Sequence, residues 1–141
     1  LQFSKNDKIT IILFSSKING IYNTMSGYET GNLIKEIENG YVGGGTALYK
    51  AIIEGLNILN QENDNYNKTI IAMTDGIINI GNYDELSSYY KKINKEIPVY
   101  SITFGSASEK ELKRIAKLTN AKVFDGKTSL LNAFKEVRGY N

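Results

Sequence analysis

The sequence has 141 residues, a formal net charge of +2, 41% hydrophobic residues and 23% charged residues, which suits one globular domain with one core. The small net charge argues against nucleic-acid binding, and no apolar stretch approaches the roughly 20 residues of a membrane span. The absence of cysteine and histidine excludes disulfides, Cys/His zinc sites and a histidine general base. Any bound metal would need oxygen ligands, which favours Mg²⁺, Mn²⁺ or Ca²⁺.

The first part of the chain predicts a hairpin followed by two helices. The run ITIILF at 9–14 is short, unbroken and rich in β-branched residues, as in a strand buried on both faces. The Asn-Gly pair at 19–20 precedes a second run at 21–25, which predicts a hairpin turn and an antiparallel edge strand. Apolar periodicity then predicts helices over 29–38 and 46–60.

Strand and helix signals continue to alternate to the end of the chain. Asp84 is predicted to cap one helix, and Ser108 with Glu111 to form a capping box for the next. The alternation predicts a three-layer α/β fold: a doubly wound, mostly parallel sheet with helices on both faces and one antiparallel edge strand. The predicted ranges, strands and helices in turn, are 69–73, 84–95, 99–104, 108–118, 122–124 and a last helix from Thr128.

Three polar segments are predicted to meet at one end of this sheet. Ligands of a doubly wound sheet bind beyond the carboxyl ends of its strands, where we expect Ser15–Ser16, Gly43–Thr46 and Thr74–Gly76. Hydroxyls, a carboxylate and backbone amides would meet there, and hard divalent cations prefer oxygen donors. Taken singly, Gly43–Thr46 could be a loop with a helix cap and Asp75-Gly76 a turn.

The order and spacing of these motifs resemble a known family. The segment Gly-Gly-Gly-Thr-Ala-Leu at 43–48, followed by an apolar strand ending in Thr-Asp-Gly at 74–76, is similar to the second and third metal motifs of von Willebrand factor A domains. Residues 6–16 resemble the family's second strand and residues 133–137 its last helix, so the resemblance spans nearly the whole chain. It implies a vWA-like, Rossmann-like fold and a single domain over 1–141.

The resemblance also implies a function. Thr46 would give its hydroxyl to a divalent metal, and Asp75 would bind the metal directly or through water. Glycines before Thr46 would let the backbone approach the ion, and an open coordination position would take an acidic side chain of a protein ligand. This implies a non-enzymatic protein-binding or adhesion module, and an extracytoplasmic or envelope location, since bacterial surface proteins often carry such domains. Residues expected to contact the partner are Ser15, Ser16, Tyr41, Gly44, Gly45 and Tyr83.

One motif of the family has no counterpart here. The Asp-x-Ser-x-Ser motif that ends the family's first strand does not occur, and the chain begins at Leu1, so we interpret it as a piece that lacks the first strand and helix. Mg²⁺ prefers about six oxygen ligands, so two ligands predict weak or no metal binding by this chain alone. The absent strand would be central, and its loss would leave two open edges. Either the first and third strands pair directly, or another segment or chain fills the slot by strand exchange or dimerisation.

Two other functions compete with the recognition module. One is a structural or assembly role with a non-functional metal site. The other is a nucleotide-dependent hydrolase, with Asp75 as a conceivable phosphoryl acceptor. A P-loop requires a lysine after its glycines, whereas Gly45-Thr46-Ala47 follows here. The sequence therefore argues against the hydrolase.

Overall fold

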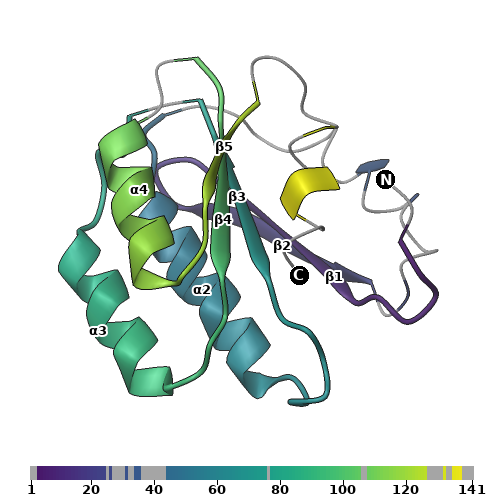
Figure 1. Ribbon diagram of the computed structural model, residues 1–141. Helices are drawn as coiled ribbons and strands as arrows, with labels where there is room; N and C mark the ends of the chain where they lie inside the picture. Colours follow the sequence, from purple (N-terminus) through teal and green to yellow (C-terminus); the bar gives the residue numbers. More distant parts are fainter. Residues whose placement is uncertain are drawn as a thin grey trace.

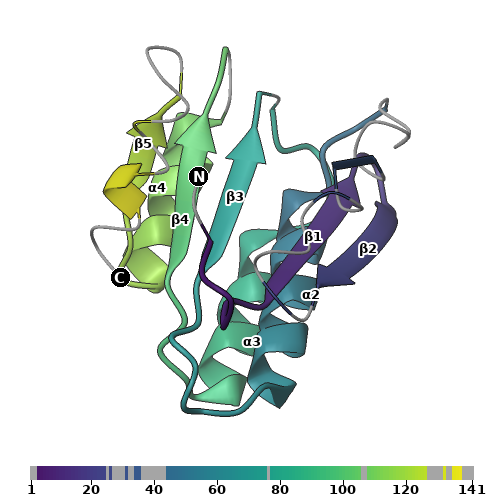
Figure 2. The same ribbon diagram turned by 90° about the vertical axis from the view of Figure 1, so that its right-hand side faces the viewer.

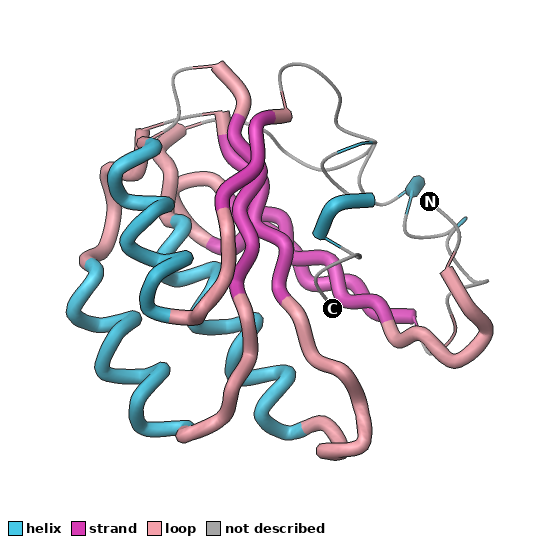
Figure 3. Tube along the Cα trace, in the orientation of Figure 1, coloured by secondary structure: helices cyan, strands magenta, loops and turns pink. Residues whose placement is uncertain are grey.

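In the part of the chain that the structure describes, the strands form two small sheets, and three long helices lie on one side of them (Figures 1 and 3). This arrangement is a Rossmann-like α/β fold, as predicted. Among the described residues, no helix is both long and apolar enough to cross a membrane. The computed structural model describes residues 3–24, 26, 31, 34–35, 44–75, 77–105, 108–126, 132 and 135–137.

The first sheet is an antiparallel hairpin of β1 (Ile9–Phe14) and β2 (Ile18–Thr24). The predicted pairing is confirmed, but the turn lies at Ser15–Lys17, where the Ser15 N–H donates to the Lys17 carbonyl (2.9 Å). The predicted turn at 19–20 is therefore wrong, because both residues belong to β2, beside an irregularity in the register. A Cβ on Gly20 would lie 2.5 Å from the Tyr22 hydroxyl, so this glycine makes room for a neighbouring ring.

The second sheet is parallel, with strand order β3-β4-β5. Its strands are β3 (Ile70–Thr74), β4 (Val99–Thr103) and β5 (Val123–Asp125), each close to its predicted range. The central strand β4 is the most buried, as expected for a short apolar strand with neighbours on both sides.

Helix α2 (Leu48–Gln61) packs against both sheets, through β1 and β3, and against α3 (Tyr83–Ile93). Helix α4 (Glu109–Leu118) packs against β4, β5 and α3. The apolar stripes of α2 and α4 pack against the strands, and α3 packs against these two helices, so that all three contribute to one core. The largest side chains in this core with almost no exposure are Leu48, Leu56, Leu86, Ile97, Val99, Ile102, Leu112 and Ile115.

The residue that caps α3 differs from the prediction. Asn82, with extended backbone, accepts the Glu85 N–H on its side-chain oxygen (2.9 Å) and is the N-cap. Asp84 lies inside the first turn, where its negative charge favours the positive end of the helix dipole. Both residue types are good caps, and the backbone conformation before the helix selects between them.

The predicted capping box of α4 is also absent. Ser108 occupies the N-cap position without a side-chain cap bond to its own helix. Its hydroxyl instead accepts the N–H of Ile78 (2.9 Å), from the loop that follows β3. The Glu111 carboxylate accepts the Tyr49 hydroxyl of α2. Both side chains are thus used in tertiary contacts.

Strands β1 and β3 are not paired within the described part of the chain, so each sheet has an open edge there (Figure 2). Direct pairing of these two strands, one of the two alternatives left by the sequence, therefore does not occur. Helix α2 lies beneath both strands and connects the two sheets.

The predicted helices at 29–38 and from Thr128 lie mostly outside the described residues. Positions 31, 34–35, 132 and 135–137 are helical. The segment 135–137 lies on the face of the strands opposite to α2, α3 and α4 (Figure 1), and its Val137 is buried. This placement agrees with the predicted third layer.

Candidate functional site

Two hydrogen bonds join three loops at the carboxyl ends of β1 and β3. The Ala47 N–H donates to the Ser15 carbonyl (2.7 Å), which ties the entry of α2 to the β1–β2 turn. The Thr46 N–H donates to the side-chain oxygen of Asn79 (2.8 Å), in the loop between β3 and α3. That loop begins at Asp75, directly after β3. We call the described residues of these three segments, 15–16, 44–47, 75 and 77–81, the rim.

Two glycines allow the rim segments to approach one another. Gly44 has φ +94°, and a Cβ there would lie 3.4 Å from the Ser16 hydroxyl. A Cβ on Gly45 would lie 2.7 Å from Ile80 and 2.8 Å from the Asn79 oxygen, closer than real Cβ contacts. A side chain at 45 would therefore separate the α2 entry from the β3–α3 loop.

Thr46 does not serve as a helix cap. Helix α2 begins at Leu48, and its N-cap is Ala47, which makes no side-chain cap bond. A threonine after glycines at a helix start is most simply explained as a helix cap, and this explanation does not apply to Thr46. Its side chain is half-buried at the rim.

Asp75 is exposed and follows the last residue of β3. Its strand is held at this end by the Phe104 N–H, which donates to the Thr74 carbonyl (3.1 Å). A Cβ on Gly105, φ +59°, would lie 3.7 Å from the Asp75 carbonyl, so the loop after β4 approaches closely. The Asp75 carboxylate is thus anchored by its backbone and open to solvent.

The predicted partner-contacting residues differ in how they are used. Ser16 is exposed, whereas Ser15 is buried and its hydroxyl accepts a hydrogen bond from the Asn19 amide (3.0 Å). Tyr83, half-buried, carries the Arg114 guanidinium over its ring at 3.9 Å, a favourable cation–π geometry. One face of that ring is therefore already occupied. Tyr41 lies outside the described residues.

A polar cluster of Tyr49, Glu111 and Arg114 lies between α2 and α4, and of the three residues Tyr49 is buried. The Tyr49 hydroxyl, in the first turn of α2, donates to the Glu111 carboxylate of α4, and Arg114 contacts the same carboxylate at 3.3 Å. Burial first, and then the bond to Glu111, raises the pKa of Tyr49. The hydrogen bond from Tyr49, with help from Arg114, lowers the pKa of Glu111. The cluster connects α2 to α4.

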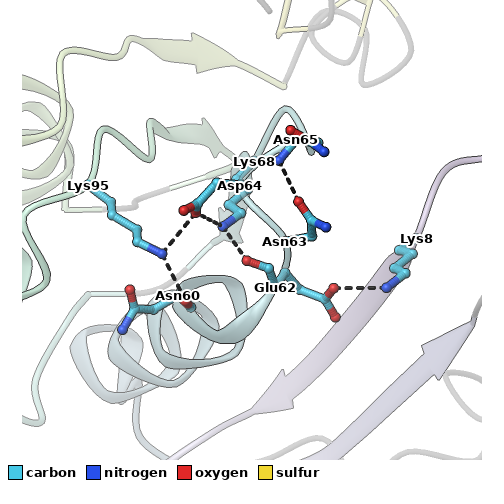
Figure 4. A network of polar contacts seen from close by, with 8 residues as sticks. All are labelled: Lys8, Asn60, Glu62, Asn63, Asp64, Asn65, Lys68 and Lys95. Carbon is cyan, nitrogen blue, oxygen red and sulfur yellow. Dashed lines mark hydrogen bonds and ion pairs between the residues drawn. The ribbon is translucent and has the colours of Figure 1, made fainter.

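A second polar cluster lies at the other end of α2 (Figure 4). The Lys68 ammonium donates to the Glu62 carbonyl (2.7 Å) and the Asp64 carboxylate (3.0 Å). The Lys95 ammonium donates to the Asn60 carbonyl (3.0 Å) and to Asp64 (2.9 Å). The hydrogen bonds from Lys95 and Lys68 lower the pKa of Asp64. These groups satisfy the carboxyl end of a helix, so we assign the cluster a structural role.

The oxygen donors at the rim fit only part of a divalent-cation site. Thr46 and Asp75, the two predicted ligands, would supply two of the roughly six oxygens that Mg²⁺ prefers. Among the residues that the structure describes, no group of three or more acidic, histidine or cysteine side chains could hold a metal ion.

Comparison with known proteins identifies the family. The sequence matches the von Willebrand factor type A domain family over residues 1–137. The chain belongs to this family. It is 30% identical over 116 residues to a von Willebrand factor A domain-containing protein of Dictyostelium discoideum, covering 77% of this chain and 12% of that protein. The vWA domain thus corresponds to a small part of that relative.

A solved structure with some likeness is described as an uncharacterized membrane spanning protein from Vibrio fischeri. The TM-score is 0.45 at 16% identity, and the likeness covers 97% of this chain and 77% of the other. Similarity at this level does not bear on the function of the vWA domain.

Two residues near the rim were not identified from sequence. Asn79 contacts Thr46 through its side chain, and Tyr49 bonds Glu111 across two helices. Asn79 follows soon after Asp75, but nothing in its local sequence distinguishes it from an ordinary loop asparagine. Tyr49 falls on the apolar side of its helix, where an aromatic residue is expected to be core.

Proposed function

We propose that this vWA domain is a non-enzymatic protein-recognition module that acts through the rim. Domains of this family are commonly protein-interaction modules. The observation that carries the proposal is the pair of hydrogen bonds from Thr46 and Ala47, which bring three loops together at one end of the strands. Exposed Ser16, Gly44 and Asp75 face solvent there, as a binding surface requires.

In this proposal the Thr46 hydroxyl and the Asp75 carboxylate are ligands of Mg²⁺, or of Mn²⁺ or Ca²⁺. A bound cation would present a positive charge to an acidic side chain of the partner protein. Two protein ligands bind a hydrated ion weakly, so we expect this chain alone to bind divalent metal only weakly. The side chains of Thr46 and Asp75 extend from backbone that hydrogen bonds hold in place, which limits the entropy lost when they bind an ion.

Paramagnetic broadening by Mn²⁺ in amide NMR spectra tests the site, because it detects weak binding residue by residue. We expect the amide signals of Ser16, Thr46 and Ile77 to broaden at lower Mn²⁺ concentrations than that of Glu96, an exposed carboxylate residue that precedes β4 at the opposite end of the sheet. Asp75→Ala should abolish the preference for the rim, and Thr46→Ala should weaken it.

Broadening at the rim that persists in Asp75→Ala would contradict the assignment of this ligand. A titration that saturates at micromolar Mn²⁺ in the unmodified chain would contradict the expectation of an incomplete site.

A second candidate is an assembly role, favoured by the open edges of β1 and β3. Unpaired backbone N–H and C=O groups along a strand are a template for another strand. Strand exchange, dimerisation or another segment of the same protein would satisfy both edges. If a captured partner stays bound in EDTA and in both Thr46→Ala and Asp75→Ala, the assembly role replaces the metal-dependent one.

A further inference from the structure

The loop between β3 and α3 is fixed to its surroundings on both sides of Asn79. Before it, the Ile78 N–H donates to the Ser108 hydroxyl at the start of α4 (2.9 Å). After it, Gly81 has φ +85°, and a Cβ there would lie 3.4 Å from that of Tyr49 in α2. Asn79 therefore extends from a backbone that is held by two different helices.

From this base, the Asn79 amide oxygen meets the entry of α2. It accepts the Thr46 N–H at 2.8 Å and lies within 2.8 Å of the place a Gly45 side chain would occupy. Thr46 precedes the first helical residue, so its N–H has no acceptor within α2. Asn79 supplies that acceptor from a different loop.

We infer that Asn79 is a positioning residue: by holding the Thr46 N–H, it sets the distance between the Thr46 hydroxyl and the loop that begins at Asp75. It acts through Thr46. This inference rests on the proposed function and deepens it, because it names the side chain that aligns the two proposed ligands. Asn79 is itself exposed, so it can be changed without opening the core.

Two variants test the hydrogen-bond acceptor, one that removes it and one of nearly the same size as asparagine that keeps it. Asn79→Ala removes the acceptor, whereas Asn79→Asp keeps an oxygen in the same place. Ile77→Ala, in the same loop and 66% exposed, is the matched control. The first readout needs no metal: hydrogen exchange of the Thr46 amide, followed by NMR. We expect exchange to be about ten-fold faster in Asn79→Ala and unchanged in Asn79→Asp and Ile77→Ala.

The second readout is the Mn²⁺ concentration that half-broadens the Thr46 and Ile77 amides. It should rise several-fold in Asn79→Ala, and stay equal or fall in Asn79→Asp, whose added charge attracts the cation. Unchanged Thr46 exchange in Asn79→Ala would overturn the inference, as would faster exchange with unaltered Mn²⁺ binding. A third outcome combines faster Thr46 exchange in Asn79→Ala with no preference of Mn²⁺ for the rim in the unmodified protein. That outcome would support the hydrogen bond between Asn79 and Thr46 and contradict the proposed metal site.

Discussion

Tyr49 shows how one side chain can join helices that are distant in sequence. Its ring is 3% exposed, and a buried hydroxyl without a partner would be costly. The Glu111 carboxylate accepts its hydrogen, and Arg114 adds a compensating charge and covers the Tyr83 ring. Because hydrogen bonds to charged groups are stronger than neutral ones, this contact fixes the entry of α2 relative to α4.

Replacing Tyr49 with Phe should lower the free energy of unfolding by about 1–2 kcal/mol at neutral pH, because a charge-assisted hydrogen bond is lost. The Glu111 pKa is lower in the folded state, so this stabilisation is present above the pKa of an unfolded glutamate, about 4.3, and is lost as the pH falls through the lowered value. Urea unfolding of the wild type and of Tyr49→Phe at pH 7 and pH 3 measures the loss of stability and its dependence on pH.

Tyr66→Phe is the control for Tyr49→Phe, because Tyr66 is 40% exposed, and it should change stability little. If the free energy of unfolding differs between wild type and Tyr49→Phe by the same amount at both pH values, the role assigned to ionised Glu111 is contradicted.

Helix α2 is completed at its carboxyl end by residues from other segments. It has no basic residue in its own last turn, although cations there favour the negative end of the helix dipole. Lys68 and Lys95 supply this charge, and their ammonium groups donate hydrogen bonds to the carbonyls of Glu62 and Asn60.

Lys68→Met should reduce stability by about 1 kcal/mol, because the Lys68 side chain is only 7% exposed and satisfies a helix carbonyl. Lys50→Met, an exposed change in the first turn of the same helix, should be neutral or slightly stabilising, since a cation there opposes the dipole. Chemical unfolding of both variants tests this. Equal effects would show that the position of the charge along α2 does not matter.

At the scale of the whole molecule, α2 connects two sheets that are not paired with each other in the described residues. Helix α2 buries its apolar face against both sheets and α4 packs against the parallel sheet, yet within the described residues one edge of β1 and one edge of β3 stay open. Open strand edges favour pairing with other chains. The helices therefore hold the two sheets in one core, whereas the open edges of β1 and β3 are available for pairing with another strand.

Met73→Lys, on β3 where Met73 is 44% exposed, should reduce concentration-dependent self-association, since a charge on an edge strand discourages pairing. Ile77→Lys makes a similar change at a more exposed residue in the loop beyond β3 and should leave association unaltered. Sedimentation velocity over a range of concentrations measures this. A similar decrease in both variants would indicate general charge repulsion instead of strand pairing.

The order and type of the elements could be predicted from the sequence because they depend on local patterns. The run at 9–14 has the β-branched composition of a strand, and the periodicity of 46–60 is that of a helix; the strand lies at 9–14 and the helix at 48–61. The turn at 19–20, the cap at Asp84 and the capping box of Ser108 with Glu111 were wrong, because a nearby residue or a tertiary contact took each role. Neighbouring rings and loops selected among them.

The sequence by itself determined the α/β class, the family and the segments that contain the candidate ligands. Only the tertiary structure decided that the two sheets stay apart, that Thr46 is held by Asn79 and that Ser108 serves a loop instead of its own helix. Propensity and periodicity act over one or two turns of chain, whereas these contacts join residues 30 or more positions apart. Such contacts depend on how the whole core packs, so no local pattern specifies them.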